Sequence, residues 1–139
     1  MIKLILSPLI SCLLATTPSP SDLQEYIACR KIEKTIFSVS DWQPLIEEYF
    51  KPEDVARAMR IIYCESSGRP RAVGVNKDGT KDVGLWQFND NTWAWLKPKL
   101  RISSPRTDPR VSTAVASWLV YNDGWYHWNS SKHCWKENK

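Results

Sequence analysis

Residues 64–89 read CESSGRPRAVGVNKDGTKDVGLWQFN and contain the most informative sequence signals of the chain. Before it, Lys51-Pro52-Glu53-Asp54 is typical of a helix start, with proline in the first turn and acidic residues behind it. An amphipathic helix should therefore begin near residue 52 and end at residue 65 or 66. Asp78-Gly79, placed between short β-compatible stretches, predicts a hairpin directly after this helix.

Two carboxylates flank the predicted hairpin. Glu65 lies at the helix end beside the apolar Ile62 and Tyr63, and Asp82 lies on the far strand. A helix end followed at once by a hairpin can place both across a cleft. Glycoside cleavage uses such a pair: a carboxylic acid with a raised pKa protonates the leaving oxygen, and an ionised carboxylate stabilises or captures the oxocarbenium ion. Spacing alone leaves open an exposed Glu65 and an Asp82 that bonds its own turn.

The rest of the chain is predicted to be helical. Apolar spacing and capping residues predict further helices at residues 22–34, near 45–50, at 89–96, from 109 to about 121, and at 125–130. The sequence therefore predicts a mostly α-helical α+β fold with one small central β-hairpin.

Composition limits the possible functions. The 139 residues form one domain with room for a hydrophobic core. Eight Trp residues indicate either a large aromatic core or a cleft with flat walls on which sugars stack. The net charge of +4 suits an anionic partner, such as bacterial wall, membrane surface or nucleic acid, without choosing among them. The His and Cys residues are not spaced in the sequence as metal ligands usually are, so we expect neither a metal nor a cofactor.

The N-terminus predicts a signal peptide over residues 1–17, followed by the catalytic domain over residues 18–139. The apolar stretch is too short to span a bilayer. A buried N-terminal helix is one alternative, and a lipoprotein box ending at Cys12 is another. If Cys12 leaves with the signal peptide, three cysteines remain, which favours one disulfide and one leftover thiol.

Residues 64–89 resemble two known sequence patterns. Residues 64–73 resemble the E-S-x-x-x-P-x-A-V start of soluble lytic transglycosylases and goose-type lysozymes. Residues 76–89 resemble the N-x-D-G-S-x-D-Y-G-x-x-Q-I-N stretch of chicken-type lysozymes, joined at the same Glu-to-Asp spacing. The helix starting at Asp108-Pro109 and the Asn122-Asp123-Gly124 segment also resemble superfamily features. The resemblance covers about residues 52–134 and implies a lysozyme-like fold.

The resemblance implies roles for individual residues. Glu65 matches the general acid, and Asp82 matches the second carboxylate. Asn89 matches the cleft asparagine that binds an acetamido sugar, Trp93 matches one of the paired cleft tryptophans, and Gln87 matches a residue that shapes the cleft floor.

Two more residues match the cleft wall. Trp128 matches the tryptophan that packs against the acid and raises its pKa, and Asp123 lies in the matched wall segment. The expected catalytic residues are therefore Glu65 and Asp82. The expected substrate-binding residues are Gln87, Asn89, Trp93, Trp128 and Asp123.

The cysteines depart from the family pattern, because most of the disulfide cysteines are missing. Cys64 directly precedes the acid, whereas the family places a cysteine one helical turn earlier on the same helix face. Cys134 falls near the partner of that cysteine. The resemblance therefore favours a Cys64–Cys134 disulfide, with Cys29–Cys134 as the alternative.

The resemblance implies a secreted or extracytoplasmic muramidase, which hydrolyses the β-1,4 bond between N-acetylmuramic acid and N-acetylglucosamine in peptidoglycan. One alternative is a lytic transglycosylase that uses Glu65 alone. Another is a non-catalytic module that binds the wall. We expect a monomer whose partner is peptidoglycan, with no nucleic acid and no stable membrane insertion.

Overall fold

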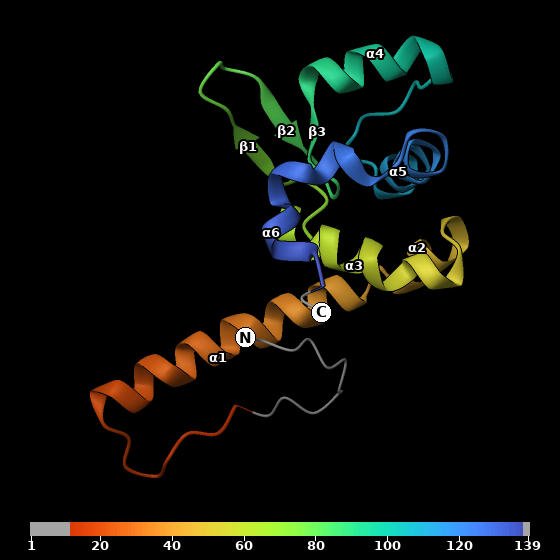
Figure 1. The fold of residues 1–139 in the computed structure, drawn as a ribbon. Helices are drawn as coiled ribbons and strands as arrows, with labels where there is room; N and C mark the ends of the chain where they lie inside the picture. Colours follow the sequence, from red (N-terminus) through yellow and green to blue (C-terminus); the bar gives the residue numbers. More distant parts are fainter. Residues whose placement is uncertain (1–11, 138–139) are drawn as a thin grey trace.

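The computed structural model describes residues 12–137, apart from the side chains of residues 35–37. The elements in this part follow in the order α1 (Pro20–Ser40), α2 (Gln43–Tyr49), α3 (Pro52–Ser66), β1 (Val73–Val75), β2 (Lys81–Val83), β3 (Phe88–Asn89), α4 (Asp90–Leu100), α5 (Pro109–Asp123), the 3-10 helix η1 (Trp125–Ser131) and α6 (Lys132–Trp135). The sheet and α4 lie on one side of the molecule and α2 and α3 on the other (Figure 1). The predicted mostly helical α+β architecture is confirmed.

Helix α3 begins and ends as its sequence predicts. Pro52 occupies the first turn together with acidic Glu53 and Asp54, where acidic side chains favour the helix dipole. Ser67 stops the helix because its backbone adopts the left-handed conformation, with φ of 52°. The buried face includes Ile61, which has no exposed surface.

The sheet is antiparallel, with strand order β1-β2-β3. Asp82 pairs with Gly74 on one side and with Asn89 on the other, so it lies in the central strand. The predicted hairpin is therefore present, and a short third strand extends it. The β-compatible stretch that follows Asp78-Gly79 forms two strands rather than one, because a turn with positive φ at Gly84 and Gln87 interrupts it.

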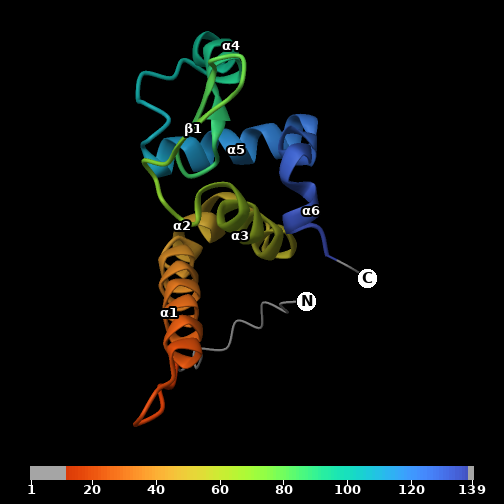
Figure 2. The same cartoon turned by 90° about the vertical axis from the view of Figure 1, so that its left-hand side faces the viewer.

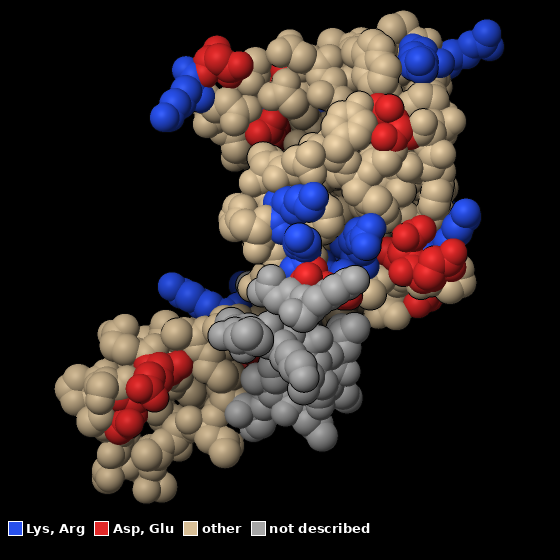
Figure 3. Space-filling model, viewed as in Figure 1, with Lys and Arg blue, Asp and Glu red and all other residues tan. Residues whose placement is uncertain are grey.

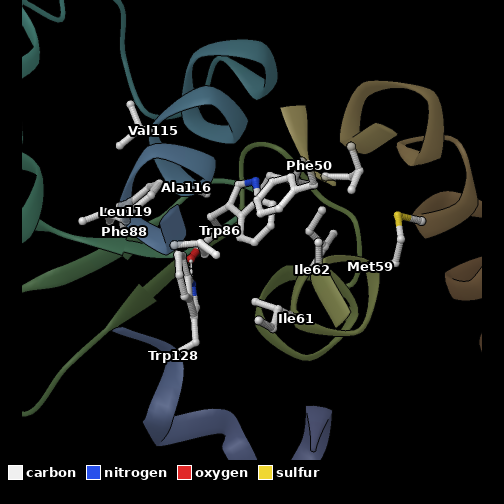
Figure 4. Close-up of a cluster of buried hydrophobic side chains, with 14 of the residues drawn as sticks. Phe50, Met59, Ile61, Ile62, Trp86, Phe88, Val115, Ala116, Leu119 and Trp128 are labelled. Atoms are coloured by element: carbon white, nitrogen blue, oxygen red, sulfur yellow. Dashed lines mark hydrogen bonds between the residues drawn. The ribbon is translucent and has the colours of Figure 1, made fainter. Parts of the chain in front are cut away.

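The core is centred on Trp86, whose side chain is fully buried (Figure 4). Its ring stacks on Phe50, with 5.4 Å between centroids, and lies 5.4 Å from the ring of Trp128. The indole N–H of Trp86 donates to Thr113 Oγ1 in α5 at 3.0 Å. Buried indole nitrogens need such partners, so this residue fixes α5 against the turn before β3.

Helix α1 is longer than the sequence predicts and extends away from the other elements (Figures 1 and 2). Its C-terminal end joins the core through Val39, which is 7% exposed, whereas Leu23 and Ile27 are more than 40% exposed. Among residues 12–137, none of the helices combines the length and apolar character that crossing a bilayer requires. On the face drawn in Figure 3, basic and acidic side chains form several separate groups rather than one large cluster of a single sign.

The disulfides confirm one prediction and correct another. Cys64 pairs with Cys134, as the resemblance favours, and this bond joins α3 to α6. In the chain with Cys12 present, Cys12 pairs with Cys29, so the Cys29–Cys134 alternative is wrong. A leftover thiol is expected only if Cys12 is removed with the signal peptide, and this stays a prediction. The predicted signal peptide falls mostly on residues 1–11, which lie outside the described part of the chain.

Helix α4 continues to Leu100 through Pro98, beyond the predicted end at residue 96. A proline inside a helix leaves the carbonyl four residues earlier without its donor. Here that residue is Ala94, and both it and Pro98 are exposed, so water can satisfy the carbonyl. The interruption therefore costs less than it would in a buried helix.

Gly84 should be intolerant of any side chain. Its φ is +90°, and an added Cβ would lie 2.3 Å from the carbonyl oxygen of Arg106. We expect Gly84→Ala to lower the free energy of unfolding by about 3 kcal/mol or more, combining backbone strain with overpacking. Urea unfolding followed by tryptophan fluorescence measures the loss.

Gly79→Ala is the matched control, because Gly79 also has a positive φ, of +84°, but no atom within 4 Å of an added Cβ. It should lose only about 1 to 2 kcal/mol, the conformational cost alone. Equal losses for the two variants would contradict the close packing of the turn against Arg106.

Candidate active site

Glu65 is the penultimate residue of α3, and its position is fixed by contacts on both sides. The neighbouring Ser66 is buried, and its hydroxyl donates to the carbonyl of Leu85 at 2.8 Å. Gly68 follows with φ of +73°, and an added Cβ there would lie 3.0 Å from the backbone of Ser38. The end of α3 is thus held between α1 and the turn that follows β2.

A cavity of about 170 Å³ opens beside Glu65. Its lining residues come from α3, the sheet, the turn before β3, α4 and η1: Glu65, Asp82, Trp86, Gln87, Phe88, Asn89, Thr92, His127, Trp128 and Ser130. A larger and more open hollow lies along α1 and includes Tyr26, Arg30 and Lys34. The smaller cavity is the candidate active site, because it brings the two predicted catalytic carboxylates together.

The environment of Glu65 favours its protonated form. Burial raises the pKa of this carboxyl group above its usual value, because charge is costly away from water. The hydroxyl of Ser131 donates to Oε1 and opposes the rise, and the negative charge of Asp82 adds to it. A carboxyl group with a raised pKa keeps its proton to higher pH than an exposed one, which suits it to general acid catalysis.

Asp82 faces the same cavity with both carboxylate oxygens engaged. Asn76 Nδ2 donates to Oδ2 at 3.1 Å, and Asn89 Nδ2 donates to Oδ1 at 2.8 Å. These bonds tie the hairpin turn and β3 to the central strand. They also hold the carboxylate in one orientation, which serves either a structural role or an electrostatic one.

The side chains of Asn89 and Gln87 both form hydrogen bonds that stabilise the fold. Asn89 caps α4, because its Oδ1 accepts from the backbone N–H of Asn91 at 3.0 Å. Gln87 Nε2 donates to the carbonyls of Ala72 at 3.0 Å and Gly84 at 2.9 Å. Both residues line the cavity, and these bonds hold their side chains in place there.

The other predicted binding residues divide into two groups. Trp128 lines the cavity and donates its indole N–H to the carbonyl of Trp86 at 3.0 Å. Trp93 is only 7% exposed and packs on Phe88, with 5.3 Å between ring centroids, outside the cavity lining. Asp123 also lies outside the lining. The structure thus brings together Glu65, Asp82, Gln87, Asn89 and Trp128, but not Trp93 or Asp123.

Ser131 and His127 are site residues that the sequence reasoning did not find. For Ser131 there was a usable signal, because Cys134 follows it closely and pairs with Cys64, the neighbour of Glu65. Nothing in the sequence marked His127. Within residues 12–137, no cluster of three or more His, Cys, Asp or Glu side chains is arranged to hold a metal ion.

A partly buried acid at a helix end, facing a second carboxylate over a small sheet, is the arrangement of lysozyme-like enzymes. The chain belongs to the transglycosylase SLT domain family, because residues 47–124, more than half of its length, match the model of that family. No curated protein and no solved structure matches the chain.

Membership of the family confirms the resemblance to the lysozyme-like superfamily and the fold class. It also makes the protein an enzyme of the class that acts on peptidoglycan. The match ends at Gly124, so Trp128 and Ser131, which contact the site from η1, lie beyond it.

The raised pKa of Glu65 predicts a pH-dependent effect on stability. A group whose pKa is higher in the folded state stabilises the fold at low pH, where the group is protonated. This contribution to the free energy of unfolding is lost as the pH rises through the folded pKa. Glu65→Gln should therefore unfold at a higher urea concentration than the parent at pH 7. The difference should shrink below about pH 4, where the carboxyl group is protonated in both states.

Glu25→Gln is the matched control, because it removes the same charge from an exposed position on α1. It should leave the urea midpoint unchanged at both pH values. A Glu65→Gln protein that is less stable than the parent at pH 7 would mean that the ionised carboxylate is favoured by its surroundings.

Proposed function

We propose that the protein is a lytic transglycosylase that cleaves the β-1,4 bond between N-acetylmuramic acid and N-acetylglucosamine. The observation that carries the proposal is Glu65 on the wall of a cavity, with a pKa raised by burial. The family match supports this reaction over hydrolysis. Because its substrate lies outside the cytoplasmic membrane, the proposal includes an extracytoplasmic site of action.

The proposed reaction uses one carboxyl group twice. Glu65 gives its proton to the glycosidic oxygen, the bond from that oxygen to C1 of the muramic residue breaks, and N-acetylglucosamine leaves with a hydroxyl group. The C6 hydroxyl of the same muramic residue then bonds to C1 and returns its proton to Glu65. The product is a 1,6-anhydro sugar, and no water is consumed.

The hydrogen bond from Ser131 suits this double use. Burial favours the protonated acid of the first step, whereas the hydroxyl of Ser131 stabilises the carboxylate that remains after proton transfer. Asp82 then acts through the fold, by holding Asn76 and Asn89, and through its charge, which raises the pKa of Glu65.

Hydrolysis is the second candidate, and the position of Asp82 favours it. Asp82 lines the same cavity as Glu65 and its charge reaches that group, so it could stabilise or attack C1 before water completes the reaction. The products distinguish the two reactions, because hydrolysis leaves reducing muramic ends.

Glu65→Gln should lower product release from purified peptidoglycan by about 100-fold or more, the usual contribution of a general acid. Mass spectrometry of the soluble fragments measures the rate, and anhydro-muramic ends are expected from the parent protein. Glu25→Gln, which alters an exposed carboxylate on α1, should act at the parent rate. An active Glu65→Gln protein would remove Glu65 from the mechanism. Wall binding without any product would indicate the non-catalytic module instead.

Asp82→Asn should retain activity within about tenfold of the parent, because the proposed reaction needs no second catalytic carboxylate and the new amide can still accept from Asn89. The matched control is Asn76→Ala, which removes one bond of the same network and leaves the carboxylate in place. A loss above about 100-fold in Asp82→Asn alone, together with reducing ends in the parent digest, would favour the hydrolase.

A further inference from the structure

His127 lies on the cavity wall beside Glu65 and has no part in the reaction described above. It belongs to η1, and its Nε2 lies 2.8 Å from Oδ2 of Asp123, at the end of α5. The hydroxyl of Tyr126 donates to the same oxygen. These bonds lower the pKa of Asp123, so its carboxylate is ionised and can only accept.

The tautomer of His127 follows from this contact. Since the carboxylate of Asp123 cannot donate, a ring that carries a single proton carries it on Nε2, and Nδ1 then holds the free electron pair. No hydrogen bond reaches Nδ1 from the described residues, and none of their buried side-chain nitrogens lacks a partner. Nδ1 is therefore accessible to solvent, on a side chain that is 17% exposed and lines the cavity.

The ring of His127 is also held in place. It stacks on the ring of Tyr126, with 4.1 Å between centroids, and meets the edge of Trp128 at 6.1 Å. A fixed acceptor on a cavity wall costs little entropy when it binds a ligand, because its side chain is already ordered. Amino sugars offer hydroxyl and acetamido N–H donors for such an acceptor.

We infer that Nδ1 of His127 accepts a hydrogen bond from a hydroxyl or acetamido N–H group of the amino sugar bound in the cavity. Asp123 is then a positioning residue, which selects the tautomer of His127. This assignment rests on the proposed function, since it concerns the same site and the same glycan. It gives Asp123 a place in substrate binding without direct contact between its carboxylate and the cavity.

Kinetics on solubilised glycan strands provide the first test. His127→Ala should raise KM by about 3- to 10-fold, the usual value of one hydrogen bond, and leave kcat within about twofold. His127→Asn should recover most of the loss, because its amide oxygen lies close to the place of Nδ1 and accepts in the same way. The assignment would be overturned if both variants had the KM of the parent. It would also be overturned if both variants had the same raised KM, because the amide of asparagine would then not replace Nδ1.

Nitrogen NMR of the imidazole rings provides the second test, in the Glu65→Gln protein, which should bind glycan without cleaving it. On addition of an N-acetylglucosamine–N-acetylmuramic acid oligosaccharide, the Nδ1 signal of His127 should shift as it accepts a hydrogen bond. His133 is the internal control, because it is exposed on α6 and does not line the cavity.

The outcomes separate this inference from the proposed function. If the oligosaccharide quenches tryptophan fluorescence but leaves Nδ1 of His127 unshifted, the histidine assignment is wrong and the proposed function stands. If the oligosaccharide does not bind, and the parent protein releases no products from peptidoglycan, the proposed function fails and the inference fails with it.

Discussion

The fully buried indole of Trp86 joins three parts of the structure. Its ring packs against α2 through Phe50, its N–H bonds α5 through Thr113, and its carbonyl receives the indole N–H of Trp128 from η1. Three elements distant in sequence therefore meet at one residue (Figure 4). Because Trp86 and Trp128 also line the cavity, the core and the candidate active site share a wall.

The surroundings of Glu65 have opposing effects on its pKa. The end of α3 is fixed by the bond from Ser66 to Leu85, and the Cys64–Cys134 disulfide brings the C-terminal segment to the same place. Burial then favours the neutral acid, while the hydroxyl of Ser131 favours the carboxylate. A group used first as an acid and then as a base needs both forms to be accessible, and the Ser131 bond limits the rise in pKa that burial causes.

Much of the fold could be predicted from the sequence, because its signals are local. Proline and acidic residues mark the start of α3, and Asp78-Gly79 marks the hairpin. The disulfide from Cys64 to Cys134 was predicted from the family resemblance instead, because it joins residues far apart in the sequence. The site was less predictable, because its details depend on packing between distant segments. On α4, Trp93 packs in the core and Thr92 lines the cavity. The position of η1 places His127 on the cavity wall and Ser131 in contact with Glu65.

In the proposed reaction, Glu65 protonates the leaving oxygen, and an internal hydroxyl of the sugar, rather than water, is the nucleophile. Digestion of purified peptidoglycan in ¹⁸O-labelled water, with mass spectrometry of the new muramic ends, tests it most directly. Attack by the C6 hydroxyl should give anhydro-muramic ends that contain no ¹⁸O. Reducing muramic ends that carry one ¹⁸O atom would contradict it and would assign the enzyme to hydrolysis.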